Sequence, residues 1–76
     1  MINEHELAVL LNDLPEHGLE AGDVGTVVSV HRGGEGYTLE FVNLAGDTVA
    51  LATVRATQVR AVSRRDITHV RELAAA

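Results

Sequence analysis

The stretch Gly22-Asp-Val-Gly-Thr-Val-Val-Ser-Val30 decides the fold. Its β-branched run, Thr26 to His31, is typical of a strand. Successive side chains of a strand point to opposite faces, so the valines of this run make both faces apolar at its start. Gly22 and Gly25 lie where the chain enters the strand, where a side chain would obstruct a tight turn or a close crossing of two backbones. We therefore expect a buried central strand.

The stretch that follows supplies the pairing strand. Arg32-Gly-Gly-Glu-Gly36 contains three glycines and predicts the reversal of a hairpin. In Tyr37-Thr-Leu-Glu-Phe41 apolar and polar residues alternate, which predicts a half-buried antiparallel strand with its apolar side chains pointing inward. The two strands together predict the central hairpin of a small β-barrel.

The segment before the hairpin fits two patterns. Leucines at positions 7, 10, 11 and 14 have helical spacing, whereas Leu7, Val9 and Leu11 alternate as in a strand. The run is short and stops at Asn12-Asp13, which favours a strand whose outer face carries Ala8 and Leu10. Residues 1–6 are polar and are expected to be frayed.

The segments after the hairpin complete the predicted fold. Thr48 to Val54 predicts a fourth strand, with Val49 and Leu51 as its main core candidates. A single helical turn over 55–58 and a brief fifth strand over 59–62 follow. Five short antiparallel strands, a long first loop over 12–21 and a one-turn connection before the last strand predict an all-β chain. Residues 1–63 are thus expected to form a small five-stranded antiparallel SH3-like β-barrel.

A different pattern begins after residue 63. Ser63-Arg-Arg-Asp66 resembles the capping box of a helix start. Ile67, Val70 and Leu73 would share one side of a helix, so residues 64–76 are predicted to form a short C-terminal helix. A helix of this length is marginal alone, and this one would pack on its own barrel or on a second chain as a homodimer.

Composition narrows the classes of function. The chain has 76 residues, 46% of them hydrophobic, and no cysteine, which excludes disulfides and thiolate metal sites. It has no lysine and a formal net charge of −5, the opposite of the basic face that nucleic-acid binders carry. No apolar run approaches the length of a membrane span, and the N-terminus lacks a signal-peptide pattern. We expect a cytoplasmic protein with a basic protein partner rather than a nucleic acid or a membrane.

Catalytic and metal-binding patterns are weak. The four histidines are scattered, and Glu16 with His17 and Glu20 is the one loop group that could coordinate a metal. No nucleophile motif is present. The glycines lead into strands rather than helices and so lack the helix-terminus site for phosphate. We expect neither an enzyme nor a bound cofactor or metal.

Two groups of residues remain as candidates for binding a partner. One is acidic and lies on the first loop and an outer strand face; it comprises Glu16, His17, Glu20, Asp23 and Glu40. The other belongs to the tail and comprises Arg64, Arg65, Ile67, Val70 and Leu73. With Arg55 and Arg60, the tail arginines form the only positive concentration, which could contact a phosphate backbone or pair with nearby carboxylates.

A resemblance adds to this interpretation. At Leu14-Pro-Glu-His-Gly-Leu19, Ala21-Gly-Asp-Val-Gly-Thr-Val-Val28, Tyr37-Thr-Leu-Glu-Phe41 and Gly46-Asp-Thr48 the chain resembles a family of small bacterial proteins, the domain of unknown function number 4926. The resemblance covers about residues 5 to 62. It implies an SH3-like barrel, and genes for toxin-like proteins beside some members imply an antitoxin or immunity role.

Wider similarities keep two other functions open. The Gly-x-x-Gly-x-Val-x-x-Val core is similar to the KOW motif, whose barrels contact RNA or protein, and to accessory barrels that bind larger partners. Three hypotheses follow: a protein-interaction module such as an antitoxin or immunity protein, a KOW-like nucleic-acid contact, and a self-associating or accessory subunit. We expect the first, because an acidic surface accelerates association with a basic partner.

Overall fold

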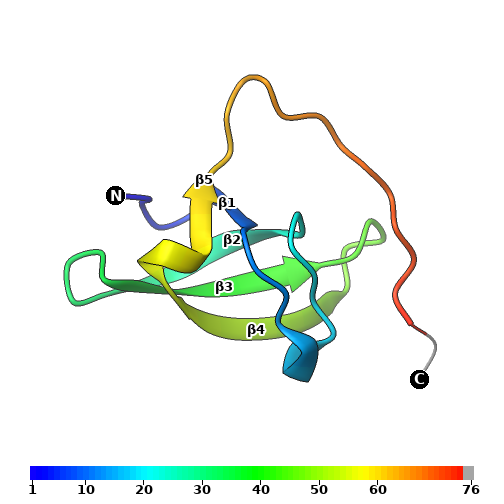
Figure 1. The fold of residues 1–76 in the computed structure, drawn as a ribbon, viewed down its shortest axis with the longest axis horizontal. Coiled ribbons are helices and arrows are strands. Elements are labelled where there is room, and N and C mark those ends of the chain that lie inside the picture. The colour runs from blue at the N-terminus through cyan, green and yellow to red at the C-terminus, as the bar shows by residue number, and fades with distance from the viewer. Residues whose placement is uncertain (75–76) are drawn as a thin grey trace.

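A computed structural model describes residues 1–74 of the chain and shows an all-β fold (Figure 1). Within these residues, five antiparallel strands form one sheet in the order β4-β3-β2-β1-β5. The strands are β1 (Leu7–Leu10), β2 (Val24–His31), β3 (Gly36–Val42), β4 (Thr48–Arg55) and β5 (Val59–Ala61). Two single turns of 3-10 helix, η1 (Pro15–His17) and η2 (Ala56–Gln58), interrupt the loops. The predicted all-β class and five antiparallel strands are confirmed, and the sheet is barrel-like.

The core lies inside the curve of the sheet. Tyr37, Leu39 and Phe41 of β3 are all buried, which confirms the inward alternation predicted for this strand. Leu10 and Val27 are also fully buried and complete the centre of the core. The long side chains of β3 therefore determine what the neighbouring strands can place beside them.

A β-bulge changes the alternation of β2. The register of β2 against β3 shifts between Val27 and Ser29, so Val28 is the extra residue. Val27 is buried and Val30 packs against the core, whereas Val28 is exposed. The extra residue thus lets Val27 and Val30 face the same side, although simple alternation predicted opposite sides.

The inward and outward faces of β1 and β4 were predicted wrongly. Ala8 and Leu10 point inward rather than outward, and Val49 and Leu51 lie exposed on the outer face instead of in the core. The reason is the bulk of Phe41. It pairs with Ala50 across the sheet, and a Cβ on Gly25, which pairs with Ala8, would lie only 2.9 Å from the Phe41 ring. Small residues must therefore face inward beside it, and their apolar neighbours face out.

The N-terminal residues are fixed in place, so the expected fraying is wrong. Ile2 is buried, and its backbone N–H donates a hydrogen bond to the hydroxyl of Tyr37 (3.1 Å). The backbone N–H of His5 donates to the carbonyl of Val27 (2.7 Å), and the Val27 N–H donates to the carbonyl of Glu6 (2.9 Å). Residues 1–6 are thus held against β2 and β3 by backbone hydrogen bonds and by one buried apolar side chain.

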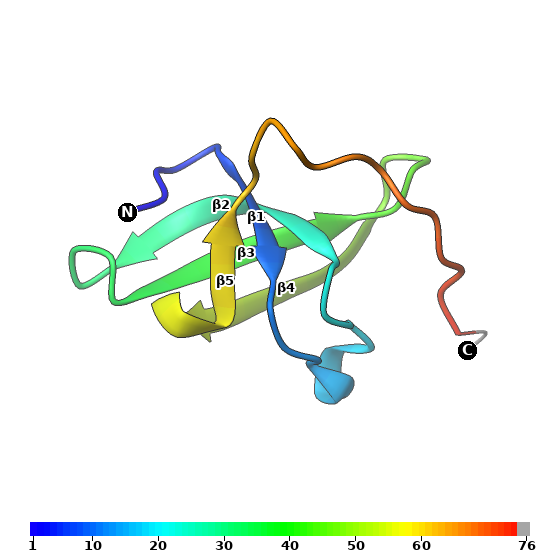
Figure 2. The ribbon, with the colours of Figure 1, turned by 45° about the horizontal axis from the view of Figure 1, so that its top comes forward.

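The predicted C-terminal helix is wrong for the described part of the tail, because residues 62–74 contain no helical turn. The Ser63 N–H donates to the Asp66 carboxylate (2.7 Å) and the Arg65 N–H donates to the Ser63 hydroxyl (3.2 Å), but these capping-box bonds close a turn. The chain then runs extended past the sheet (Figures 1 and 2). Extension reaches about twice as far per residue as a helix, which lets Arg71 contact the first loop. Residues 75 and 76 of the predicted helix lie outside the described residues.

Candidate interaction site

The tail and the outer face of the sheet enclose a groove of about 530 Å³, called here the tail groove. Its floor is made by apolar side chains of the sheet and its loops, and its far wall by residues 66–71 and Leu73 of the tail. Figure 2 shows the tail passing over this end of the sheet toward the C-terminus. The floor includes Leu7, Val24, Val42, Leu44, Val49 and Val62.

Much of this apolar surface is open to solvent. Among residues 1–74, thirteen large apolar side chains are at least 37% exposed. Leu44 on the floor is 89% exposed, and Ile67 and Val70 on the tail are 91% and 69% exposed. Single exposed apolar residues are normal, but a group of them around one groove is typical of a surface that another molecule covers.

An arginine holds the tail at the rim of the groove. The guanidinium of Arg71 donates from Nε to Oδ1 of Asp23 (2.8 Å) and from Nη2 to Oδ2 of the same carboxylate (2.5 Å). Nη2 also donates to the carbonyl of Gly18 (3.3 Å), and Nη1 lies 3.6 Å from Oε2 of Glu20. These hydrogen bonds lower the pKa of Asp23 below its ordinary value and raise the pKa of Arg71. The first loop is therefore a receptor for a guanidinium.

Hydrogen bonds within the first loop, separate from those of Arg71, hold the loop in shape. Leu14 and Leu19 are buried and exchange two backbone hydrogen bonds (2.9 and 3.1 Å) that fold the loop back on itself. The Glu20 N–H donates to Oδ2 of Asp23 (2.8 Å), and the Asp23 N–H donates to the Glu20 carbonyl (3.0 Å). Gly22 has φ +95°, a conformation that side chains disfavour, so the turn that places Asp23 requires a glycine.

A second ion pair fixes the start of the tail. Arg60 of β5 donates from Nη1 and Nη2 to the two oxygens of Asp66, both at 2.9 Å. This fork-shaped pairing holds the pKa of Asp66 well below its usual range. Because Asp66 neutralises Arg60, the predicted cluster of arginines loses one of its members as a free positive charge.

The structure brings together only some of the predicted site residues. Glu20 and Asp23 of the acidic loop meet the tail through Arg71, and Ile67, Val70 and Leu73 line the groove. The others stay apart: Glu16 and His17 lie exposed on η1, and Arg64 and Arg65 form an exposed turn and make no ion pair within residues 1–74.

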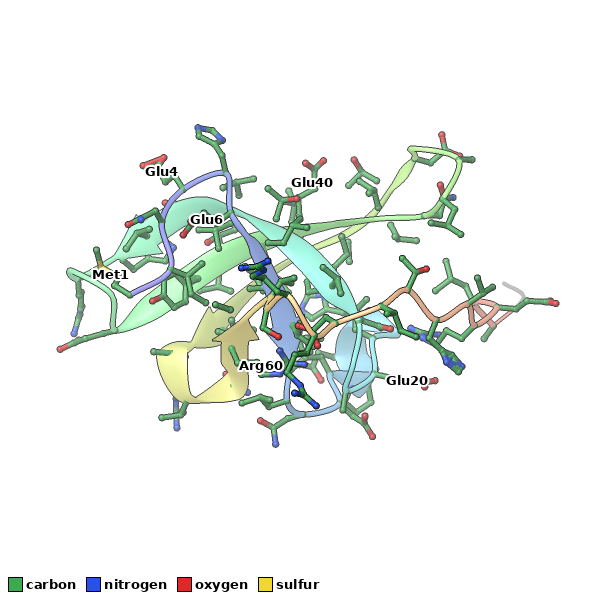
Figure 3. All side chains as sticks on the ribbon, turned by 90° about the horizontal axis from the view of Figure 1, so that it is seen from above. Met1, Glu4, Glu6, Glu20, Glu40 and Arg60 are labelled. Carbon is green, nitrogen blue, oxygen red and sulfur yellow. The ribbon has the colours of Figure 1, made fainter. Side chains whose placement is uncertain are left out.

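Glu40 also lies apart from the groove. It accepts a hydrogen bond from the Thr48 hydroxyl (2.6 Å), and Figure 3 shows it well away from Glu20. The acidic residues that the sequence grouped as one surface thus lie in separate places on the molecule: Glu16 on η1, Glu20 and Asp23 beside Arg71, and Glu40 beside Thr48.

Sequence reasoning missed the residue that organises the site. Arg71 was not among the candidates, although it is the single arginine in residues 67–76. The floor residues Val24 and Val42 were also missed, because their exposure follows from sheet packing around Phe41 rather than from local pattern. Leu44, in the turn between β3 and β4, was missed as well. A lone arginine 48 positions after an acidic loop was the available signal.

The described residues offer little to other kinds of site. Within residues 1–74, no group of three or more His, Cys, Asp or Glu side chains is placed to hold a metal ion. In the same part of the chain, neither 3-10 turn nor any other helix is long and apolar enough to cross a membrane. Among the described residues, the tail groove combines an apolar lining with the charged pair of Asp23 and Arg71 at its rim.

Fold and groove together define a small all-β, barrel-like domain with an apolar groove under an ion-paired tail. The chain belongs to the family described as Domain of unknown function (DUF4926), whose model matches residues 4–61. That match ends where β5 ends, so the tail that forms one wall of the groove lies beyond it. No curated protein and no solved structure was found to match the chain.

Proposed function

We propose that this protein is a non-catalytic protein-interaction module that binds its partner in the tail groove. The observation that carries the proposal is the pairing of an open apolar floor with an acidic rim that already holds a guanidinium. Apolar area supplies most of the affinity of an interface, and a buried arginine is among its common anchors. The groove provides for both.

The partner is expected to present apolar side chains beside an arginine or lysine. Arg71 occupies the place of that basic residue, bound to Asp23 and facing Glu20. A partner that inserts its own basic residue displaces Arg71 and lifts the tail, which opens the floor around Val24 and Val42. The formal net charge of −5 favours approach of a basic partner over long distances.

The finer form of the proposal is that the partner is a toxin, and that this protein is its antitoxin or immunity protein in the bacterial cytoplasm. Support comes from the implied gene neighbourhood of the family and from the acidity of the chain. A small SH3-like barrel of this kind acts by covering a surface of the toxin, without chemistry of its own.

Co-purification with the product of the neighbouring gene tests the proposal. We expect a stoichiometric complex with the full chain, lost or weakened at least tenfold when Val42→Asp places a charge on the groove floor. Leu11→Asp is the matched control, because Leu11 has nearly the same exposure (47% against 50%) but does not line the groove. Recovery of no complex, or equal loss in both variants, would contradict the proposal.

A further inference from the structure

The first loop binds the guanidinium of Arg71 through groups at three different positions of the loop. The carboxylate of Asp23 accepts hydrogen bonds from Nε and Nη2, and the carbonyl of Gly18 accepts a further one from Nη2. The third nitrogen, Nη1, lies 3.6 Å from Oε2 of Glu20. Three of the five N–H groups of this arginine are thus hydrogen-bonded to the loop. We call the two carboxylates and the carbonyl the guanidinium receptor.

The guanidinium receptor is held in shape by hydrogen bonds that do not involve Arg71. The backbone beside Asp23 is joined to β1, because the Gly22 N–H donates to the Leu10 carbonyl (2.8 Å) and the Leu10 N–H donates to the Asp23 carbonyl (2.9 Å). The Glu20 N–H donates to Oδ2 of the Asp23 carboxylate (2.8 Å) and so fixes the direction of that side chain. The shape of the receptor is therefore set by the first loop and β1 rather than by the tail.

The tail of the chain is a loosely packed occupant of the receptor. Its two ion pairs lie at residues 66 and 71, and between them Ile67 and Val70 are 91% and 69% exposed. Lifting this segment exposes little apolar surface that is not already in water. Arg71 stays in the receptor mainly through its own hydrogen bonds, so another arginine that makes the same bonds can replace it.

An arginine and a lysine would fill the receptor differently. A guanidinium carries its donors on three nitrogens, and Nε and Nη2 reach the two oxygens of Asp23 in parallel. A lysine ammonium carries all its donors on one nitrogen and cannot form that fork. Because other bonds fix the receptor, it does not close around a smaller group, and some of its oxygens would lose their partners. The Asp23 side chain is only 18% exposed, so such a loss is incompletely repaid by water.

We propose that the guanidinium receptor is selective for arginine, and that the basic residue which a partner inserts there is an arginine and not a lysine. The inference rests on the proposed function for the source of that arginine, a partner protein, and adds the class of side chain that the site recognises. The partner's arginine takes over the hydrogen bonds that Arg71 now donates to Asp23 and Gly18. One guanidinium replaces another, so the Asp23 carboxylate is paired both before and after the exchange.

Small arginine and lysine derivatives test this selectivity on the full chain. Arg71→Ala empties the receptor, and the two probes, N-acetyl-arginine amide and N-acetyl-lysine amide, carry the same single positive charge. We expect the arginine probe to shift the amide NMR signals of Gly18, Glu20 and Asp23 in a saturable way. The lysine probe should bind at least about fivefold more weakly. Equal affinities for the two probes, or no saturable shift with the arginine probe, would overturn the proposal.

Two double variants separate the receptor from the general acidity of the loop. Adding Asp23→Asn to Arg71→Ala removes the carboxylate that forms the fork, and the response to the arginine probe should be lost. Adding Glu16→Gln instead removes a carboxylate of the same loop that is exposed and makes no ion pair within residues 1–74, and the response should be kept. Equal losses in the two double variants would mean that the probe follows the charge of the loop, which contradicts a receptor.

A substitution that conserves charge tests the receptor within the chain itself. Arg71→Lys keeps the charge of the tail and loses the fork, so the amide signals of Gly18 and Asp23 should move close to their positions in Arg71→Gln. Signals that stay at their positions in the unaltered chain would contradict the selectivity. None of these measurements needs a partner. Failure to recover a complex would therefore contradict the proposed function, whereas failure to distinguish the two probes would contradict only the selectivity for arginine.

Discussion

Arg71 binds Asp23 through two parallel hydrogen bonds across 48 positions of sequence, and this pair closes the tail over the first loop. The side chains of Arg71 and Asp23 are 28% and 18% exposed, so the pair is partly shielded from water. A carboxylate held by a guanidinium in this forked geometry fixes direction as well as distance. The position of the tail therefore depends on one side chain.

Replacing Arg71 should release the tail without unfolding the sheet. In Arg71→Gln the guanidinium is lost, and the apolar side chains of residues 67–73 hold the tail only loosely. We expect limited proteolysis to cut within residues 64–74 faster than in the unaltered chain, while the melting temperature changes little. Arg65→Gln is the control, since Arg65 makes no ion pair within residues 1–74. Equal cutting of both variants would show that Arg71 does not hold the tail.

Docking of the tail should depend on pH through Asp23. Hydrogen bonds from Arg71 chiefly lower the pKa of this carboxyl below its ordinary 3.8, against the opposing effect of partial burial. A carboxyl with a lower pKa in the docked state favours docking fully above its ordinary pKa, and loses that contribution as the pH falls toward the docked value. We expect the tail to stay docked at neutral pH and to loosen below about pH 4, followed by NMR shifts of the Arg71 Nε–H. The same shifts in Asp23→Asn should lack this transition.

Gly25 should tolerate no side chain beside Phe41. A Cβ at residue 25 would lie 2.9 Å from Cε2 of Phe41 and 3.2 Å from the Glu40 carbonyl oxygen. Gly25→Ala is expected to lower the free energy of unfolding by about 1–3 kcal/mol, the usual cost of overpacking. Urea unfolding measures it. The double variant Gly25→Ala with Phe41→Leu should lose less unfolding free energy than the two single variants lose together. If the two losses simply add, the clash with Phe41 is not the cause.

The hydroxyl of Tyr37 should anchor the N-terminus. It accepts a hydrogen bond from the Ile2 N–H in a buried place, so Tyr37→Phe leaves that N–H without its partner while the ring stays packed. We expect a loss of about 1–3 kcal/mol in the free energy of unfolding. Hydrogen exchange at Ile2 should quicken, whereas exchange at Leu39 should follow only the global change. An unchanged rate at Ile2 would contradict this role.

The sequence predicted the strands and turns better than it predicted which face of each strand points into the core. Glycine-rich turns and the alternation from Tyr37 to Phe41 are local signals, and the hairpin they predict is present. The inward faces of β1 and β4 were mistaken because Phe41 requires Gly25 and Ala50 beside it, a demand set by residues far apart in the chain. The hydropathy pattern of one strand does not indicate how large the side chains on the neighbouring strands are.

The sequence predicted only part of the candidate site, because only some of its residues have local signals. The acidic loop was found because Glu20 and Asp23 are close in sequence, and the apolar tail residues because of their spacing. The helix predicted for that tail is absent for two reasons. The Arg71–Asp23 pair holds the chain in an extended course. In addition, the β-branched residues Ile67, Thr68 and Val70 disfavour a helix, and so short a helix needs packing to be stable. A contact spanning 48 positions has no local signature.

The most direct test of the tail groove is the affinity of the co-purified partner for two variants, each lacking one half of the same ion pair, measured by isothermal titration calorimetry. If a basic residue of the partner takes the place of Arg71, Arg71→Ala removes a competitor and binding tightens. Asp23→Asn removes the receptor and binding weakens. Opposite changes are the predicted result. Weakening in both variants, or no change in either, would contradict binding in the tail groove.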